Sequence, residues 1–271
     1  MPLEKSGGIF YLRNHLLIRQ NNVMDLIAAI IAGSAIGAVL GFIGAGGAML
    51  SLPILIYIFS FTPHQATTAA LAVVFAAALS GALVRARRSE VLYRDAFVIW
   101  AIGLITNLGF SLYVNHLPAS FITIGFALIL ITAATSMLRS PLTKVNRRMP
   151  LWVLILLSLV IGAITGIFGI GGGFLAIPVL VLFFGTPQSV ATGTSLFIIA
   201  ANSLTALLAR HNTWHELHWH IPLLMAISAV IVAQLSARIS KRVNDEVLRK
   251  AFALLLCAIA VFTVLQTLLQ F

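Results

Sequence analysis

Long apolar runs separated by short polar stretches dominate the chain, and their spacing predicts membrane-spanning helices. Ten apolar segments stand out, at residues 24–43, 46–60, 65–84, 95–114, 118–138, 151–170, 172–184, 188–209, 220–237 and 248–270. Most have about the 20 residues that a helix needs to cross the hydrocarbon core of a bilayer. The segments at 46–60 and 172–184 are shorter, and predict half-helices, re-entrant pieces or kinked spans. The pattern therefore predicts an all-α polytopic membrane protein.

The second half of the chain repeats the first at a spacing of 125 residues. Gly41-Phe-Ile-Gly-Ala-Gly-Gly47 matches Gly166-Ile-Phe-Gly-Ile-Gly-Gly172, and Pro53 and Pro178 each follow the first glycine at the same distance. Such self-similarity indicates a duplicated structural unit. Further matches are Ala66-Thr67 with Ala191-Thr192, and the pair Thr62-Pro63 with Thr186-Pro187. The predicted parts are a polar or interfacial lead-in (1–23), a first repeat of five segments (24–138), a cytoplasmic linker (139–150) and a second repeat of five segments (151–271).

The basic residues predict that the two repeats are inverted relative to each other. The loop after the third segment carries Arg85, Arg87, Arg88 and Arg94, whereas its counterpart after the eighth carries only Arg210. The loop after the fourth segment has no Lys or Arg, whereas its counterpart after the ninth is strongly basic. Lys and Arg mark the cytoplasmic side. Equivalent loops therefore lie on opposite sides.

An odd number of segments duplicated in tandem gives repeats of opposite orientation. A parallel arrangement with four spans per repeat places almost as many Lys and Arg residues on the cytoplasmic side, so the reversal between equivalent loops is what favours inversion. We expect a multi-pass protein of a bacterial inner membrane with both termini outside the cytoplasm.

The glycine-rich motifs predict a binding site for a small anion. Each glycine would destabilise a continuous helix by about 1 kcal/mol, and broken backbone at membrane depth is tolerated where protein buries it or a cavity adjoins it. The free N–H groups of a helix start, together with the helix dipole, favour an anion, and matching breaks in two halves mark transport sites. The candidate binding residues are Gly44, Gly46, Gly47, Gly169, Gly171, Gly172 and Gly173, with Pro53 and Pro178 as structural kinks.

Helix packing is the alternative role for glycines in apolar segments. Small residues spaced by four let membrane helices approach closely. We assign this role to the glycines that keep this spacing, which are Gly33, Gly37, Gly41, Gly162 and Gly166.

Hydroxyl side chains open the segments that follow the two short ones. They can replace water around an oxyanion, or bond back to their own helix. The candidate ligands are Thr67, Thr68, Thr192, Thr194 and Ser195. Asn202 is also a candidate because polar groups at membrane depth are either functional or join helices. Its counterpart is Ala77, so we expect an asymmetric site, with Asn107 as a weaker candidate.

Composition excludes several other classes of protein. Hydrophobic residues make up 60% of the chain and charged residues 9%, whereas a soluble domain carries about 25% charged residues. The net charge of +10 comes from basic residues in short loops, so we expect a lipid bilayer and a small anionic substrate as partners, and no nucleic acid. The seven acidic residues lie in loops or near segment ends. This distribution favours an anionic or neutral substrate, although backbone carbonyls could hold a cation.

Four histidines offer the main alternative function. His211, His215, His218 and His220 lie in one loop with Trp214 and Trp219. The pair at i and i+4 could bind a metal, which would suit a metal-dependent membrane enzyme or an assembly subunit. The other interpretation is an interfacial aromatic belt. We expect no catalytic residue, no metal and no cofactor, and the sequence lacks a phosphate-binding loop for ATP. An anion channel and a homodimer both stay open.

The repeated motifs resemble the TauE/SafE family of membrane permeases. The resemblance is carried by Gly41-Phe-Ile-Gly-Ala-Gly-Gly47, by Gly166 to Pro178 and by Thr186-Pro-Gln-Ser-Val-Ala-Thr-Gly-Thr-Ser-Leu196. It covers residues ~25 to 270 and is looser in the first repeat, where Ala69-Ala70 replaces Thr194-Ser195. The resemblance implies a secondary transporter, commonly an exporter, for sulfite or an organosulfonate.

Overall fold

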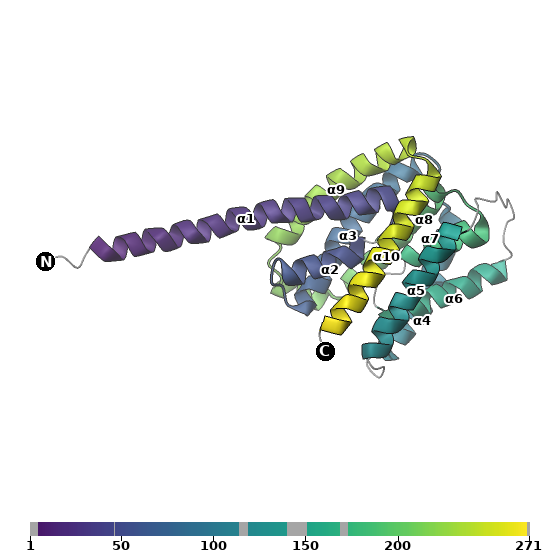
Figure 1. Ribbon diagram of the computed structural model, residues 1–271, viewed down its shortest axis with the longest axis horizontal. Coiled ribbons are helices and arrows are strands. Elements are labelled where there is room, and N and C mark those ends of the chain that lie inside the picture. Colours follow the sequence, from purple (N-terminus) through teal and green to yellow (C-terminus); the bar gives the residue numbers. More distant parts are fainter. Residues whose placement is uncertain (1–4, 46, 114–118, 140–150, 169–172, 270–271) are drawn as a thin grey trace.

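The apolar segments become helices close to their predicted positions. The computed structural model describes residues 5–45, 47–113, 119–139, 151–168 and 173–269, and within them it contains no strand (Figure 1). The all-α prediction is therefore confirmed. The α-helices are α1 (Lys5–Ile43), α2 (Gly47–Tyr57), α3 (Pro63–Ala86), α4 (Tyr93–Tyr113), α5 (Ala119–Arg139), α6 (Leu151–Phe168), α7 (Gly173–Phe184), α8 (Gln188–Ala209), α9 (His220–Ile239) and α10 (Asp245–Leu269).

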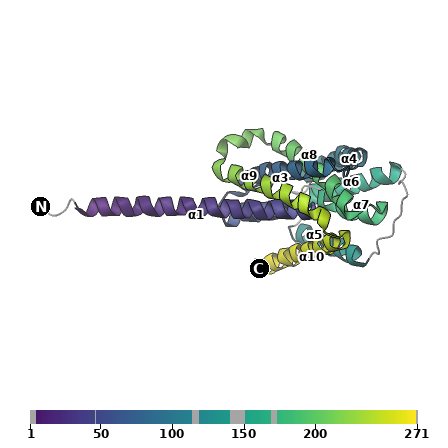
Figure 2. The same ribbon diagram turned by 90° about the horizontal axis from the view of Figure 1, so that it is seen from above.

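The first helix is longer than the sequence pattern predicts. It begins at Lys5, so most of the predicted lead-in is helical, and its N-terminal part projects from the bundle (Figures 1 and 2). No proline interrupts residues 5–43, so nothing stops the helix from extending beyond its apolar part. By length and hydropathy, the described segments able to cross a bilayer are Val23–Ile43, Gln65–Ala86, Gln188–Ala209 and His220–Arg242.

Two short helices follow the glycine-rich motifs, as predicted. α2 has 11 residues and α7 has 12. At about 1.5 Å per residue they are roughly 16–18 Å long, about half of the ~30 Å hydrocarbon core. Pro53 and Pro178 lie inside these helices. Gly44 ends α1 with a φ of +80°, a conformation that glycine adopts easily and other residues do not.

The same turn follows both half-helices at the 125-residue spacing. Ser60 and Gly185 have positive φ angles of 55° and 60°. The next backbone amide then donates to a carbonyl six residues earlier: Phe61 N–H to Leu55 at 3.0 Å, and Thr186 N–H to Leu180 at 3.2 Å. This shared geometry supports the predicted internal repeat.

The turn also shows how the two repeats align. The Thr62 hydroxyl caps α3 by accepting a bond from the Gln65 N–H at 3.4 Å, in a capping box. At a spacing of 125 its counterpart is Pro187, which gives α8 no side-chain cap. The sequence match of the two Thr-Pro pairs is therefore one residue out of register.

Helix packing follows the same internal symmetry. α1 packs on α9 as α6 packs on α4, and α2 packs on α3 as α7 packs on α8. α3 also packs on α8, and α5 on α10, which lie side by side in both views (Figures 1 and 2). Exchanging α1–α5 with α6–α10 converts each of these pairs into another pair or into itself.

The equivalent helices α3 and α8 run antiparallel. Gly81 packs against Leu196, and Arg85, one turn further along α3, donates to the Ser189 carbonyl near the start of α8 at 3.2 Å. Residue numbers therefore rise along one helix as they fall along the other. Because these helices occupy the same place in each repeat, their opposite directions support the inverted arrangement.

Glycines allow the closest helix crossings. A Cβ atom at Gly37 of α1 would lie 2.8 Å from the Ala229 Cα in α9, and one at Gly162 of α6 would lie 2.7 Å from the Gly103 carbonyl carbon in α4. Gly33 and Gly41 meet α9 in the same manner. The packing role predicted for Gly33, Gly37, Gly41 and Gly162 is confirmed.

Candidate functional site

The first glycine-rich break lies against α8 of the other repeat. The Thr192 hydroxyl donates to the Ile43 carbonyl at 3.1 Å, and the Ser195 hydroxyl donates to the Gly44 carbonyl at 3.0 Å. Carbonyls at the end of a helix lack a partner within it, so these bonds satisfy the end of α1. The structure thus brings together three of the predicted site residues.

The hydroxyl groups of Thr192, Thr194 and Ser195 in α8 all donate hydrogen bonds to backbone carbonyls of the protein. Thr194 donates to the Val190 carbonyl at 2.8 Å and accepts from the Leu92 N–H at 3.1 Å. Together with Thr192 and Ser195, it fastens α8 to the end of α1 and to the segment before α4. In this conformation the hydroxyls position the backbone of the break, and binding of an anion by them stays a prediction.

Several other predicted residues lie at the starts of α2, α7 and α3. Gly47 begins α2 and packs against Leu40, and Gly173 begins α7. Thr68 is buried and Thr67 is half-buried in the first turns of α3. Gly46, Gly169, Gly171 and Gly172 lie outside the described residues.

One apolar cluster joins the first break to the short helix of the second repeat. Ala45 lies in the break, and its side chain is fully buried. It shares this cluster with the first turns of α7, at Leu175, Ala176 and Ile177. The first break and the start of α7 therefore share one apolar cluster. Whether the two half-helix N-termini face each other stays a prediction, because residues 169–172 are outside the described part.

Arg85 forms a buried polar cluster that sequence reasoning missed. Its side chain is 1% exposed although it stands in the last turn of α3, where the sequence suggested a loop charge. Its guanidinium forms an ion pair with Glu90 at 3.2 Å. It also donates to the Gly41 carbonyl at 3.0 Å, the Ser240 hydroxyl at 3.0 Å and the Ser189 carbonyl at 3.2 Å. One side chain therefore joins the ends of α1, α3, α8 and α9.

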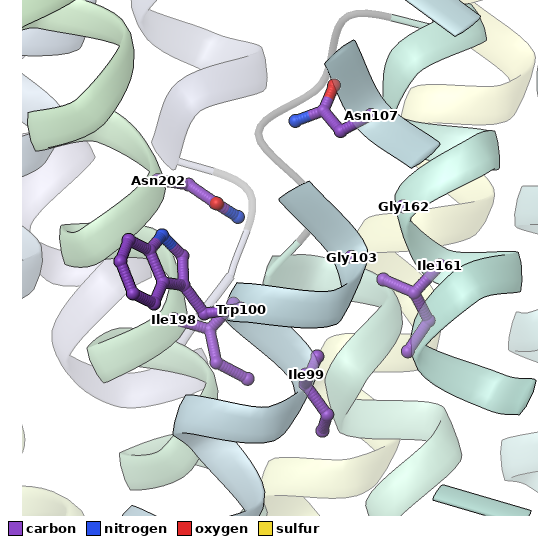
Figure 3. A pocket seen from close by; sticks show the side chains of 8 residues that line it. All are labelled: Ile99, Trp100, Gly103, Asn107, Ile161, Gly162, Ile198 and Asn202. Atoms are coloured by element: carbon purple, nitrogen blue, oxygen red, sulfur yellow. The ribbon is translucent and has the colours of Figure 1, made fainter. Parts of the chain in front are cut away.

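A polar pocket opens where α4, α6 and α8 meet (Figure 3). The space open to the centre of a water molecule is about 10 Å³. A space of this size holds about one water. Asn107 and Asn202, both predicted candidates, line it. The full lining consists of Ile99, Trp100, Gly103, Asn107, Ile161, Gly162, Ile198 and Asn202.

Trp100 is the pocket residue that sequence reasoning missed. Its indole nitrogen is buried and has no hydrogen-bond partner among the described residues. Trp100, Gly103 and Asn107 are spaced by three and four residues, so they share one face of α4. The sequence could have indicated Trp100 as a pocket residue, because it shares a helical face with Asn107.

The histidine loop takes the form of an aromatic cluster. The Trp214 and Trp219 rings pack edge to face with centroids 6.3 Å apart, and their indoles donate to the carbonyls of Leu207 and Trp214. His218 and His220 pack edge to face at 6.2 Å. Within the described part of the chain, no three His, Cys, Asp or Glu side chains gather as a metal site requires.

The broken helices, the apolar spans and the buried small-residue crossings define a multi-pass membrane protein. The family profile described as "Sulfite exporter TauE/SafE" matches residues 29–263. The chain therefore belongs to the TauE/SafE family.

Relatives of nearly the same length carry transporter names. A "Probable membrane transporter protein" of Xylella fastidiosa (strain 9a5c) is 27% identical, with 89% of this chain and 96% of the relative covered. The "Probable membrane transporter protein YunE" of Bacillus subtilis (strain 168) is 24% identical, with 86% and 93% covered. No solved structure matches the chain. Family and relatives together identify a membrane transporter.

Proposed function

We propose that the protein is a secondary transporter of a small anion, with sulfite or an organosulfonate as substrate and export as its direction. The observation that carries the proposal is the break after α1. There Gly44 leaves the helix and α2 begins at Gly47. The first N–H groups of α2 have no partner within the helix, and the helix dipole adds partial positive charge at this end.

The buried polar residues also suit an anion. Among the described residues, the buried polar side chains are hydroxyls, Gln188, Arg85 and Arg249, and none is a carboxylate. Glu90, which lies beside this buried set, is paired with Arg85. Cation transporters commonly place a carboxylate within the spans. The side-chain chemistry therefore favours a negatively charged substrate.

The internal symmetry suggests how transport proceeds. The break of the first repeat is held by α8 of the second, through the Thr192 and Ser195 hydroxyls. Inverted repeats allow two related conformations that open to opposite sides of the membrane around one site. We infer alternating access in a bacterial inner membrane, with both termini outside the cytoplasm.

The test is flux in proteoliposomes that contain the purified full-length protein. We expect saturable uptake of labelled sulfite or taurine, and faster uptake when the lumen is preloaded with the unlabelled compound. Protein-free liposomes are the control. Absence of flux with every sulfur oxyanion tested would remove the substrate assignment. Flux without saturation or counterflow would indicate a channel.

A further inference from the structure

The pocket between α4, α6 and α8 has the chemistry of an anion subsite. We propose that it binds one oxygen atom of a small oxyanion through the N–H groups of Trp100, Asn107 and Asn202. The inference rests on the proposed function, because it names a place where the transported anion binds. It differs from the glycine-rich breaks, because none of the glycines predicted to bind the anion lines the pocket.

The unpaired indole of Trp100 is the first argument. A buried donor without a partner destabilises a protein by about 1–3 kcal/mol. The indole nitrogen can only donate. A ligand atom that relieves this N–H must therefore be an acceptor, which an oxyanion oxygen is and a metal cation is not.

The two asparagines supply further donors around the same space. Each side-chain amide carries two N–H groups. In Figure 3 the indole nitrogen of Trp100 lies on the side of the ring nearer to Asn202, and Asn107 lies further along α4. No acidic residue lines the pocket, so no negative charge opposes an anion. The space of about one water fits one oxygen atom, with the rest of the ligand in the open mouth.

The internal repeat shows that the fold does not need these polar residues for packing. At the 125-residue spacing, Trp100, Asn107 and Asn202 correspond to Met225, Val232 and Ala77. Met225 and Ala77 are fully buried in an apolar cluster. The equivalent junction of α9, α1 and α3 thus lacks counterparts of these three N–H donors. Its one polar change is Ser228 at the place of Gly103, and the Ser228 hydroxyl donates to carbonyls of its own helix. The presence of these N–H donors at one junction and their absence from its twin indicate a function that only one of the two junctions provides.

Equilibrium binding to the detergent-purified full chain tests the pocket. We would titrate sodium sulfite into wild-type protein and into Trp100→Phe, which removes the N–H but keeps an aromatic ring. Loss of a hydrogen bond to a charged ligand should weaken sulfite binding about tenfold or more. The matched control is Trp152→Phe, since Trp152 on α6 is 67% exposed and lies away from the pocket lining. Its affinity should stay within twofold of the wild type.

A second variant keeps the test decisive if Trp100→Phe folds poorly. Asn202→Ala introduces the residue that the first repeat carries at the equivalent place, so it should fold and should also weaken sulfite binding. Wild-type affinity in both variants, or no sulfite binding by the wild type, would overturn the subsite. Chloride binding of equal strength and equal dependence on Trp100 would overturn the assignment to an oxyanion.

Flux measured beside binding separates this inference from the proposed function. Sulfite binding that depends on Trp100, without flux, would support the subsite and remove the assignment of sulfite as the transported substrate. Wild-type flux that is unchanged in Trp100→Phe and Asn202→Ala would support transport and overturn the subsite.

Discussion

Gly44 sets the geometry of the first break. Its φ of +80° turns the chain out of α1, and its missing side chain lets Thr192 approach from α8. A Cβ atom at this position would lie 2.9 Å from the Thr192 Cα. The same glycine therefore ends one helix and permits the contact that holds the break in place.

Replacing Gly44 with alanine should destabilise the protein by about 2 kcal/mol or more. A left-handed conformation costs a residue with a Cβ roughly 1–2 kcal/mol, and the clash with Thr192 adds to this cost. Thermal unfolding of the purified protein in detergent measures the effect. The matched control is Gly109→Ala in α4, where a new Cβ meets nothing within 4 Å. It should be neutral or slightly stabilising because alanine favours a helix. Equal stability of the two variants would show that Gly44 is not constrained.

Sequence reasoning identified residues whose type alone is unusual in a membrane. Gly44, Thr192, Ser195 and Asn202 stand out as polar or helix-breaking positions within apolar runs. Arg85 and Trp100 were missed because their roles depend on partners distant in the chain. Arg85 is buried by helices that end near residues 41, 189 and 240. The unpaired state of Trp100 depends on how three helices cross.

At the scale of elements, apolar length predicts the helices well and their ends less well. The short helices α2 and α7 follow from glycine and proline at fixed spacing. The start of α1 at Lys5 does not follow from hydropathy, because a helix can continue outside the apolar span. The sequence predicted only some of the helix pairs that pack together, through the glycines spaced by four.

The crossing of α1 and α9 should not tolerate a large residue at Gly37. A leucine there would place its Cβ 2.8 Å from the Ala229 Cα, so the helices must separate. Overpacking of this kind costs about 1–3 kcal/mol, and we expect a lower unfolding temperature and a lower yield of Gly37→Leu. The control is Ala35→Leu on the exposed side of the same helix, which should stay within about 0.5 kcal/mol of the wild type. Equal losses in both variants would argue against a packing role for Gly37.

Arg85 should matter more than the carboxylate paired with it. Arg85→Ala removes the bonds to Gly41, Ser189 and Ser240 and leaves Glu90 without its partner. We expect a loss of about 3 kcal/mol or more. Glu90→Gln leaves the other three acceptors in place, and should cost less, about 1.5–3 kcal/mol, because the buried guanidinium loses only one charged acceptor. Chemical or thermal unfolding of both variants gives the comparison. Similar losses would mean that the ion pair, and not the joining of helix ends, is what stabilises this region.

At the scale of the whole molecule, the symmetry of the two repeats relates helices whose contacts the sequence alone does not predict. The duplicated motifs predict equivalent positions, and the loop charges predict that the repeats are inverted. The contacts add that α3 and α8, one from each repeat, pack together in opposite directions. This packing follows from side-chain shape at the crossing, which hydropathy does not encode.

The last prediction concerns the two ends of α8. Ser89 lies beside its N-terminal turns, since the neighbouring Leu92 N–H donates to Thr194 at 3.1 Å. His215 follows its C-terminal end, in the short helix His211–Glu216. The 22 residues of α8 span about 33 Å, close to the ~30 Å of the hydrocarbon core. The two positions should therefore lie on opposite sides of the membrane, with Ser89 in the cytoplasm.

Cysteine labelling in intact cells measures this arrangement. The single native cysteine, Cys257, is first replaced by serine, and Ser89→Cys and His215→Cys are then introduced separately. A membrane-impermeant maleimide should label His215→Cys from outside, and Ser89→Cys only after the membrane is permeabilised. The variant with Cys257→Ser alone is the control for background labelling. Labelling of both positions from one side would contradict the inverted repeat. Opposite labelling with the sides exchanged would keep the inversion and overturn the predicted orientation, because the basic residues Arg87, Arg88 and Arg94 would then face outwards.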